Sequence, residues 1–297
     1  MSRYAWLFLA PVLAVAACGT EDATVANVTD APAPDPETIY TGTGTVMETA
    51  ETGPQLCLGG VAESYPPQCG GPDISNWSWD EVDPDTYESA SGSTWGVYVV
   101  TGRYDGETFE LTEPASSAMY TTPPPVDHQE PDFSSPCEPP AGGWAVVDPE
   151  KTNDDALQEA LQLAAEQPDY AGAWVDQSIN PASEAESDLE AEEAMNDPSL
   201  LVLNVQFTGD LERHEAELRE VWGGALCVSE AEHTEAELRA IQDELVDIPG
   251  FLGAGVDTSG GVVTLQVEID DGLQQRLDEQ YGEGIVRVTA ALTPVDP

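Results

Sequence analysis

An internal repeat in the C-terminal half of the chain constrains the fold more than any other feature. Residues 168–176, "PDYAGAWVD", align with residues 249–257, "PGFLGAGVD", at the Pro, Gly, Ala, Val and Asp positions. Further on, "LREVWGGALCVS" aligns with "LDEQYGEGIVRV", because each has a Leu, then three residues, then an aromatic residue followed by Gly. Self-similarity of this kind indicates one supersecondary unit present twice.

The hydrophobic pattern assigns helices and strands to both copies. Asn153 is placed to cap a helix over residues 153–167, whose apolar face has Ala156, Leu157, Ala160, Leu161 and Ala164. The expected elements that follow are strands 169–177 and 200–207, helix 211–222, strand 225–229, helix 234–247, strands 251–257 and 262–269, helix 273–282 and strand 285–292.

Both copies therefore have the order helix, strand, strand, helix, strand. Residues 151–297 are predicted to form a duplicated α-β-β-α-β domain, with repeats at 153–230 and 234–295 and with one sheet or two packed half-sheets. An acidic insertion at 177–199 in the first copy takes the place of the tight turn "TSGG" in the second.

Residues 39–112 are predicted to form a small all-β domain, so the fold class is α+β. Two apolar runs meet at Asp105-Gly106, which is a strong hairpin signal. Strand number and glycine placement favour an OB-like barrel over a sandwich, and its open face is either a ligand site or a plain scaffold. Most of the core is expected from Trp77, Trp79, Trp95, Tyr98 and Tyr104.

Two segments lack hydrophobic periodicity. Residues 18–38 contain Ala, Pro, Thr and acidic residues, a composition typical of a disordered tether. Residues 113–150 are rich in proline, which removes backbone donors and disfavours helix, so an extended connector is expected there.

The N-terminus has the pattern of an export signal. A short apolar run follows Arg3, too short to span a bilayer but typical of a signal peptide, here residues 1–17. Residues 15–18, "VAAC", resemble a bacterial lipobox. That resemblance implies that Cys18 is diacylated and becomes the new N-terminus, which places the protein on the extracytoplasmic face of the cell membrane. An ordinary signal peptide with an unmodified cysteine is the alternative.

Four cysteines remain after Cys18, an even number for an oxidising compartment. Cys57 and Cys69 are the local pair, and closing a loop of this size stabilises a chain by about 3 kcal/mol. By elimination Cys137 pairs with Cys227. Zinc is the rival interpretation, but the spacing lacks the C-x2-C of structural zinc sites.

The charge excludes one class of partner. The chain has 57 acidic against 8 basic side chains, a net charge of −49. Nucleic acid is excluded because its phosphates are bound through Lys and Arg. Solubility explains the acidity better than cation binding, because no calcium-loop motif is present, and neither a metal nor a cofactor is expected.

No catalytic set is expected from the motifs. Residues 256–261, "VDTSGG", lack the second loop of an aspartic protease and the positioned base of a serine protease, and Ser259 is expected in a hairpin turn. His128, His214 and His233 are interpreted as solvated surface residues. A glycosidase-type carboxylate pair stays open, because two carboxylates among 57 cannot be singled out by eye.

Two family likenesses follow from these segments. From the lipobox through "LCLGG", "PPQCGGP", "PPAGGWAVVDP" and "WGGALCVS", the chain is similar to uncharacterised actinobacterial lipoproteins. About 100 residues, including "YAGAWVDQ", "LVLNVQFTGD" and "PGFLGAGVD", resemble the pro-region of alpha-lytic and streptogrisin-type serine proteases. The second resemblance implies a paired α/β module that assists the folding of a protease and then inhibits it.

The sequence therefore favours a lipid-anchored, non-enzymatic interaction or structural module with a secreted or envelope protein as its partner. The alternatives are a regulator of a secreted serine protease, acting through residues 151–297, and an envelope hydrolase.

Overall fold

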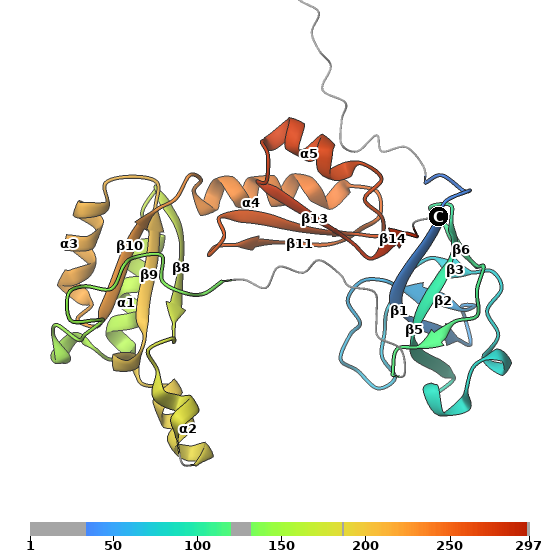
Figure 1. Cartoon of the computed structure of the whole chain (residues 1–297), viewed down its shortest axis with the longest axis horizontal. Coiled ribbons are helices and arrows are strands. Elements are labelled where there is room, and N and C mark those ends of the chain that lie inside the picture. Colours follow the sequence, from blue (N-terminus) through green and yellow to red (C-terminus); the bar gives the residue numbers. More distant parts are fainter. Residues whose placement is uncertain (1–33, 120–131, 186, 296–297) are drawn as a thin grey trace, which may run out of the picture.

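The computed structural model describes residues 34–119, 132–185 and 187–295. The expected signal peptide, Cys18 and most of the tether lie outside these ranges. The described residues form a β-rich unit and two units of helices packed on a sheet (Figure 1), so the fold is α+β as predicted. Within these ranges, every helix is too short or too polar to cross a membrane.

Five strands of the β-rich unit close into a barrel. All pairings are antiparallel except the parallel pair β3–β6. Around the barrel the order is β1 (Ile39–Thr49), β2 (Gln55–Cys57), β3 (Asp73–Ile74), β6 (Thr108–Leu111) and β5 (Ser93–Tyr104), which pairs again with β1. Two short strands add to β5, namely β4 (Glu88–Ala90) and β7 (Ser116–Ser117).

The barrel core is more aliphatic than the sequence suggests. Tyr98 and Tyr104 are buried in it as predicted, whereas Trp77 and Trp79 pack against it only partly buried and Trp95 contacts Tyr65 instead. The remaining buried core residues are Tyr40, Val46, Leu56, Ile74, Val100, Phe109 and Leu292.

The hairpin predicted at Asp105-Gly106 is confirmed. Tyr104 lies opposite Phe109 in the β5–β6 pair, and Gly106 has φ of 99°, a conformation that glycine adopts without strain. The Asp105 carboxylate accepts hydrogen bonds from the backbone N–H groups of Glu107 and Thr108 at 3.0 and 2.8 Å.

The C-terminal strand belongs to the barrel. β14 (Leu292–Pro294) pairs with β1, and Leu292 is fully buried in the barrel core. A Cβ at Gly42 would collide with the carbonyl oxygen of Ala291, so glycine is required for this approach. The second repeat was expected to extend to residue 295, but its last strand, β14, pairs with the barrel and not with the α/β sheet.

The first α/β unit, residues 153–230, is one three-stranded sheet with two helices on one face. Asn153 caps the first helix as predicted, since its Oδ1 accepts the N–H of Ala156 at 3.0 Å. The central strand β9 is antiparallel to β8 and parallel to β10. The elements are α1 (Asp154–Ala165), β8 (Tyr170–Asp176), β9 (Val202–Phe207), α3 (Leu211–Val221) and β10 (Ala225–Glu230).

The second α/β unit, residues 234–290, has the same element order and the same pairings in a separate sheet. Both sheets even have a register shift near the start of their first strand, at Tyr170/Gly172 and at Phe251/Gly253. Thr234 and Glu237 form a capping box at the first helix. The elements are α4 (Glu235–Glu244), β11 (Phe251–Asp257), β12 (Val262–Val267), α5 (Leu273–Tyr281) and β13 (Val286–Ala290).

The acidic insertion at 177–199 is a helical excursion. Its helix α2 (Asp188–Met195) buries none of its side chains and extends away from the first α/β unit (Figure 1). The corresponding residues of the second unit form the β11–β12 turn. The excursion therefore adds surface without adding to the core.

Candidate functional site

Two disulfides fasten irregular segments to sheets. Cys57, in β2, is joined to Cys69, and Cys137 is joined to Cys227, in β10, across a sequence separation of 90. These are the pairs expected from the sequence. Cys18, the expected lipid attachment site, lies outside the described residues.

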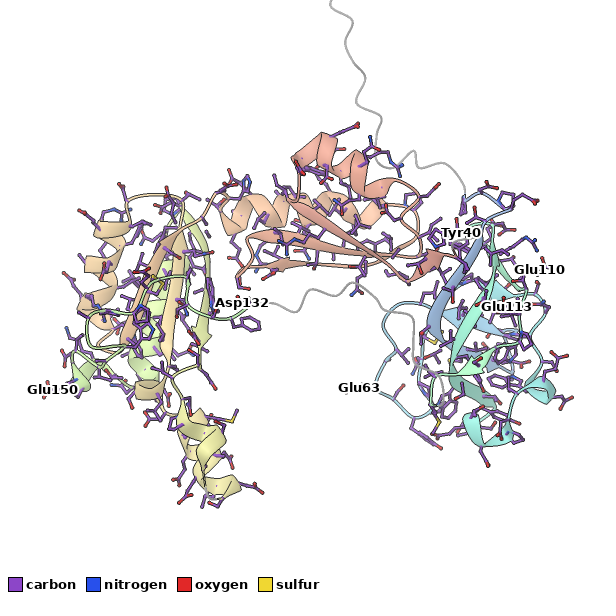
Figure 2. The ribbon with its side chains drawn as sticks, in the orientation of Figure 1. Tyr40, Glu63, Glu110, Glu113, Asp132 and Glu150 are labelled. Atoms are coloured by element: carbon purple, nitrogen blue, oxygen red, sulfur yellow. A yellow bond between two sulfur atoms is a disulfide. The ribbon has the colours of Figure 1, made fainter. Side chains whose placement is uncertain are left out.

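Part of the expected connector is a covering segment, which we call the strap, residues 132–148. Asp132 and Glu150 lie on opposite sides of the first α/β unit (Figure 2), so the strap crosses that unit. In the strap, Cys137 and Trp144 pack against Val202, Ala225 and Cys227. These three residues alternate along their strands with residues that face the helices, such as Leu203 and Leu226. The strap therefore lies on the face of the sheet that carries no helix. Of the rest of the expected connector, Ser116–Ser117 form β7 beside the barrel, and residues 120–131 lie outside the described residues.

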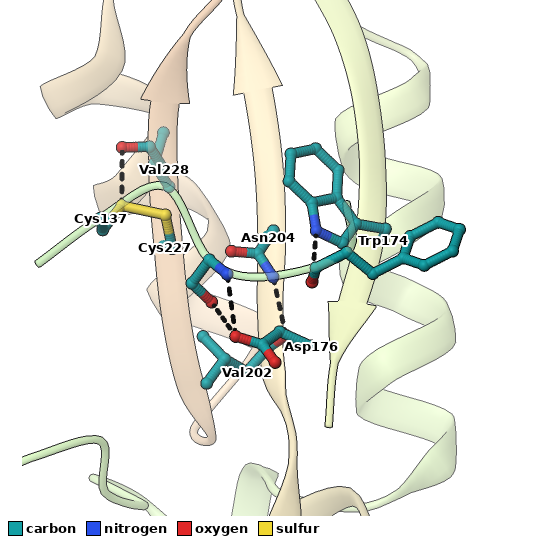
Figure 3. The surroundings of a disulfide bond; sticks show 9 residues. Cys137, Trp174, Asp176, Val202, Asn204, Cys227 and Val228 are labelled. Carbon is teal, nitrogen blue, oxygen red and sulfur yellow. Dashed lines mark hydrogen bonds between the residues drawn. A yellow bond between two sulfur atoms is a disulfide. The ribbon is translucent and has the colours of Figure 1, made fainter. Parts of the chain in front are cut away.

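Hydrogen bonds fix the strap along the sheet (Figure 3). Trp174 Nε1 donates to the carbonyl of Phe133 at 3.0 Å. The backbone N–H and the hydroxyl of Ser135 both donate to Asp176 Oδ2 at 2.8 Å. At the other end, the N–H groups of residues 147 and 148 donate to the carbonyl of Gly223. The strap is thus held at both ends and, through Cys137, in the middle.

Asp176 is the charged group under the strap, and only 4% of it is exposed. Burial by itself raises the pKa of its carboxyl group, but hydrogen bonds from Ser178 and Ser135 outweigh this effect and hold the pKa below its ordinary value. Nearby, the side chain of Asn204 is fully buried and its Nδ2 donates to the carbonyl of Val202 at 3.2 Å. Asp176 therefore holds the strap, whereas Asn204 bonds within its own strand, and both side chains are closed to solvent.

The interpretation of His214 as a solvated residue is wrong. Its side chain is 1% exposed, stacks on Phe207 with ring centroids 3.7 Å apart, and its Nε2 lies 2.8 Å from Asp169 Oδ2. The hydrogen bond from His214 is the main cause that lowers the pKa of Asp169. The sequence did carry a signal for this burial, because His214 shares a helix face with Leu211, Leu218 and Val221.

An acid–histidine pair of this kind does not make a catalytic triad here. Among the described residues, no Ser, Thr or Cys side chain is hydrogen-bonded to His214, and solvent does not reach the ring. His233 is half-buried just before α4, and His128 lies outside the described residues. Neither described histidine is assembled with a nucleophile.

The "VDTSGG" segment forms the β11–β12 turn. The N–H and hydroxyl of Ser259 donate to Asp257 Oδ1 at 3.1 and 2.7 Å, and the N–H of Gly260 donates to the same oxygen at 3.0 Å. One carboxylate oxygen thus closes the turn, as expected for Ser and Gly in a hairpin. Over residues 34–119, 132–185 and 187–295, no group of three or more His, Cys, Asp or Glu side chains is placed to hold a metal ion.

The barrel surface has an aromatic cluster that the sequence did not distinguish from core. Trp77 packs edge-on against Trp79 and Tyr98, with ring centroids 5.2 and 4.9 Å apart. Beside Trp77 is a cavity of about 200 Å³ between residues 76–82 and 111–115. Of the surfaces described here, this one combines aromatic rings, a cavity and unshielded carboxylates, so it is the candidate binding site.

Comparisons of this chain with known protein families, with curated proteins and with solved structures found no match.

Proposed function

We propose that this chain is a lipid-anchored, extracytoplasmic protein that acts as a non-catalytic interaction or structural module. The observation that carries the proposal is the pair of disulfides, which hold a loop on β2 and the strap on β10. Disulfides persist in oxidising compartments outside the cytosol. The lipobox-like residues 15–18 supply the anchor.

The state of the polar groups supports a role without catalysis. A catalytic acid, base or nucleophile must reach a substrate. The carboxylates that draw attention in the sequence and the fold, Asp169, Asp176 and Asp257, are each engaged in hydrogen bonds within the protein. Asp169 bonds to His214 in α3, Asp176 holds the strap, and Asp257 closes the β11–β12 turn.

Fractionation of cells tests the anchor. The wild-type chain is expected in the membrane fraction and accessible to added protease on cells stripped of their wall. The Cys18→Ala chain, with the same folded body, is expected to lose the lipid and to leave the membrane fraction. Equal membrane association of both chains would contradict lipidation at Cys18.

We also propose the finer assignments of the fold. Numbered within the barrel, the strand order is 1-2-3-5-4-1 with strands 3 and 5 parallel, which supports an OB-type barrel. The matching pairings and register shifts of the two α/β units support a duplication.

Regulation of a secreted serine protease is the second candidate. It is supported by the paired α/β units, which have the arrangement that the resemblance to protease pro-regions implies. The soluble chain from Thr20 is then expected to inhibit an alpha-lytic-type protease at micromolar concentration and to leave a subtilisin-type protease unaffected. Equal activity of the alpha-lytic-type protease with and without the chain would remove this candidate.

A further inference from the structure

Charged residues are scarce in three segments of the barrel unit. Residues 39–47, 53–72 and 93–102 contain a single charged side chain, Glu63, among 39 residues. In the chain as a whole 22% of the residues are charged, so about eight or nine charges would be expected in these segments. The three segments belong to β1, to β2 with the loop that follows it, and to β5.

Strand pairing joins the outward side chains of β1 and β5 into one surface. Tyr98 and Val100 alternate with these outward positions of β5 and are buried in the barrel core. We call the outward surface, together with the loop over residues 58–68, the neutral face. Its cross-strand pairs are Thr43 with Val99, Thr45 with Val97, and Met47 with Trp95.

The disulfide-closed loop packs on the neutral face and exposes an aromatic side chain. Cys69 Sγ, in the bond to Cys57, lies 3.6 Å from Met47 Sδ, and the Tyr65 ring packs edge-on against Trp95 with centroids 5.5 Å apart. Tyr65 is still 74% exposed, more than any other large hydrophobic side chain in the described part of the chain, and Val97 is 45% exposed. Apolar groups are therefore offered to solvent from a braced backbone.

Acidic side chains border the neutral face. Glu88 lies opposite Trp95 in the β4–β5 pair, Glu63 lies in the loop, and both are exposed. In Figure 2, Glu63 lies on the opposite side of the barrel from Glu110. An uncharged centre with Tyr and Trp, surrounded by a charged rim, is the arrangement found in protein–protein interfaces.

The charge of the chain selects among possible occupants of this face. A second copy, also with a net charge of −49, is repelled, and so is a bilayer surface of anionic headgroups. A basic protein is attracted by the same charge, and Glu63 and Glu88 offer acceptors to its Lys and Arg side chains at the rim. We propose that the neutral face binds a basic protein through an uncharged contact centred on Tyr65 and Val97. This inference rests on the proposed interaction role and names its surface.

Site-specific photo-crosslinking tests the proposal. The exported, disulfide-bonded chain is prepared with p-benzoyl-L-phenylalanine in place of Tyr65, added to wall-stripped cells of its own organism and irradiated, and the adducts are identified by mass spectrometry. The matched control carries the same crosslinker in place of Leu189, which is 65% exposed on α2. We expect position 65, and not position 189, to yield an adduct with a protein of positive net charge.

Titration of the crosslinked partner, once purified, measures the contribution of each side chain. Tyr65→Ala and Val97→Ala are each expected to weaken its affinity by roughly fivefold or more, whereas Leu189→Ala is expected to leave it unchanged. Association should also slow as the salt concentration rises from about 0.05 M to about 0.5 M, because salt screens the attraction between unlike charges.

Several outcomes would overturn the proposal. They are no adduct from position 65, an adduct with a second copy, with lipid or with an acidic protein, and equal affinity of the wild-type and Tyr65→Ala chains. An adduct from position 189 alone would move the interaction to another surface and leave the proposed interaction role standing. Unmodified Cys18, by contrast, would contradict the anchor and leave the neutral face untouched.

Discussion

Leu292 provides the sharpest test of how the chain is assembled. It lies near the C-terminus, yet its side chain is fully buried in the barrel core beside Tyr40, Val100 and other N-terminal residues. Its strand pairs with β1, with Leu292 opposite Gly42. Leu292→Ala should therefore destabilise a barrel that is more than 180 residues away in the sequence.

The magnitude follows from burial and from the rigidity of the site. Truncating a buried Leu to Ala costs about 2–5 kcal/mol, and the cost is larger where the surroundings cannot collapse. Here the neighbouring backbone is held by the pairing of β1 with both β5 and β14. For a domain of this size, such a loss lowers the melting temperature by about 10 °C or more.

Scanning calorimetry, together with near-ultraviolet circular dichroism, measures the effect. Val295→Ala is the matched control, because that side chain is 43% exposed, and a change within about 0.5 kcal/mol is expected. Gly42→Ala should act like Leu292→Ala, since its Cβ would displace the backbone at Ala291. If Leu292→Ala melts like Val295→Ala, β14 does not belong to the barrel.

Three further predictions concern the first α/β unit. Replacing Cys137 and Cys227 together by Ser releases the strap, and the unfolding free energy in urea is expected to fall by about 2–5 kcal/mol; an unchanged midpoint would contradict a stabilising strap. Burial raises the pKa of Asp176, but its hydrogen bonds lower the pKa by more, so the folded pKa lies below the unfolded value of about 3.9. The ionised carboxylate therefore contributes its full stability above about pH 3.9, and this contribution is lost as the pH falls through the folded pKa. Stability measured from about pH 5 to pH 2 should therefore fall more steeply in the wild type than in Asp176→Asn, and parallel curves would refute this role. His214→Ala, which removes the ring stacked on Phe207 and the bond to Asp169, should cost about 2–4 kcal/mol in the same assay, against about 0.5 kcal/mol or less for the half-buried His233→Ala.

Features that depend on neighbouring residues are predictable from the sequence. The hairpin at Asp105-Gly106 needs only a turn that accepts a positive φ, and the start of α1 needs only Asn153 and the N–H three residues later. The two α/β units are predictable because their elements are long enough to show periodicity and because the pattern occurs twice.

Features made by distant residues are not predictable in this way. The strap bonds to residues 41 positions away, through Phe133 with Trp174 and Ser135 with Asp176, and no local pattern contains that information. Closure of the barrel depends on β3, which has two residues and is too short for an alternation to show. The pairing of β14 with β1 joins opposite ends of the chain.

The candidate binding site was hidden for a related reason. Trp77 and Trp79 stand two residues apart in the same segment, and the sequence predicts both as core residues. The difference between them is that Glu48 accepts the N–H of Trp79, whereas Trp77 faces two loops brought together by Asn76 and Leu111. That difference arises from folding and not from spacing.

Lipidation of Cys18 can be measured as the mass of the N-terminal peptide of the mature protein, isolated from the membranes of its own organism. We expect a peptide that begins at Cys18 and carries a diacylglyceryl group on its sulfur. A peptide that begins elsewhere, or one in which Cys18 is unmodified, would contradict the lipid-anchored module.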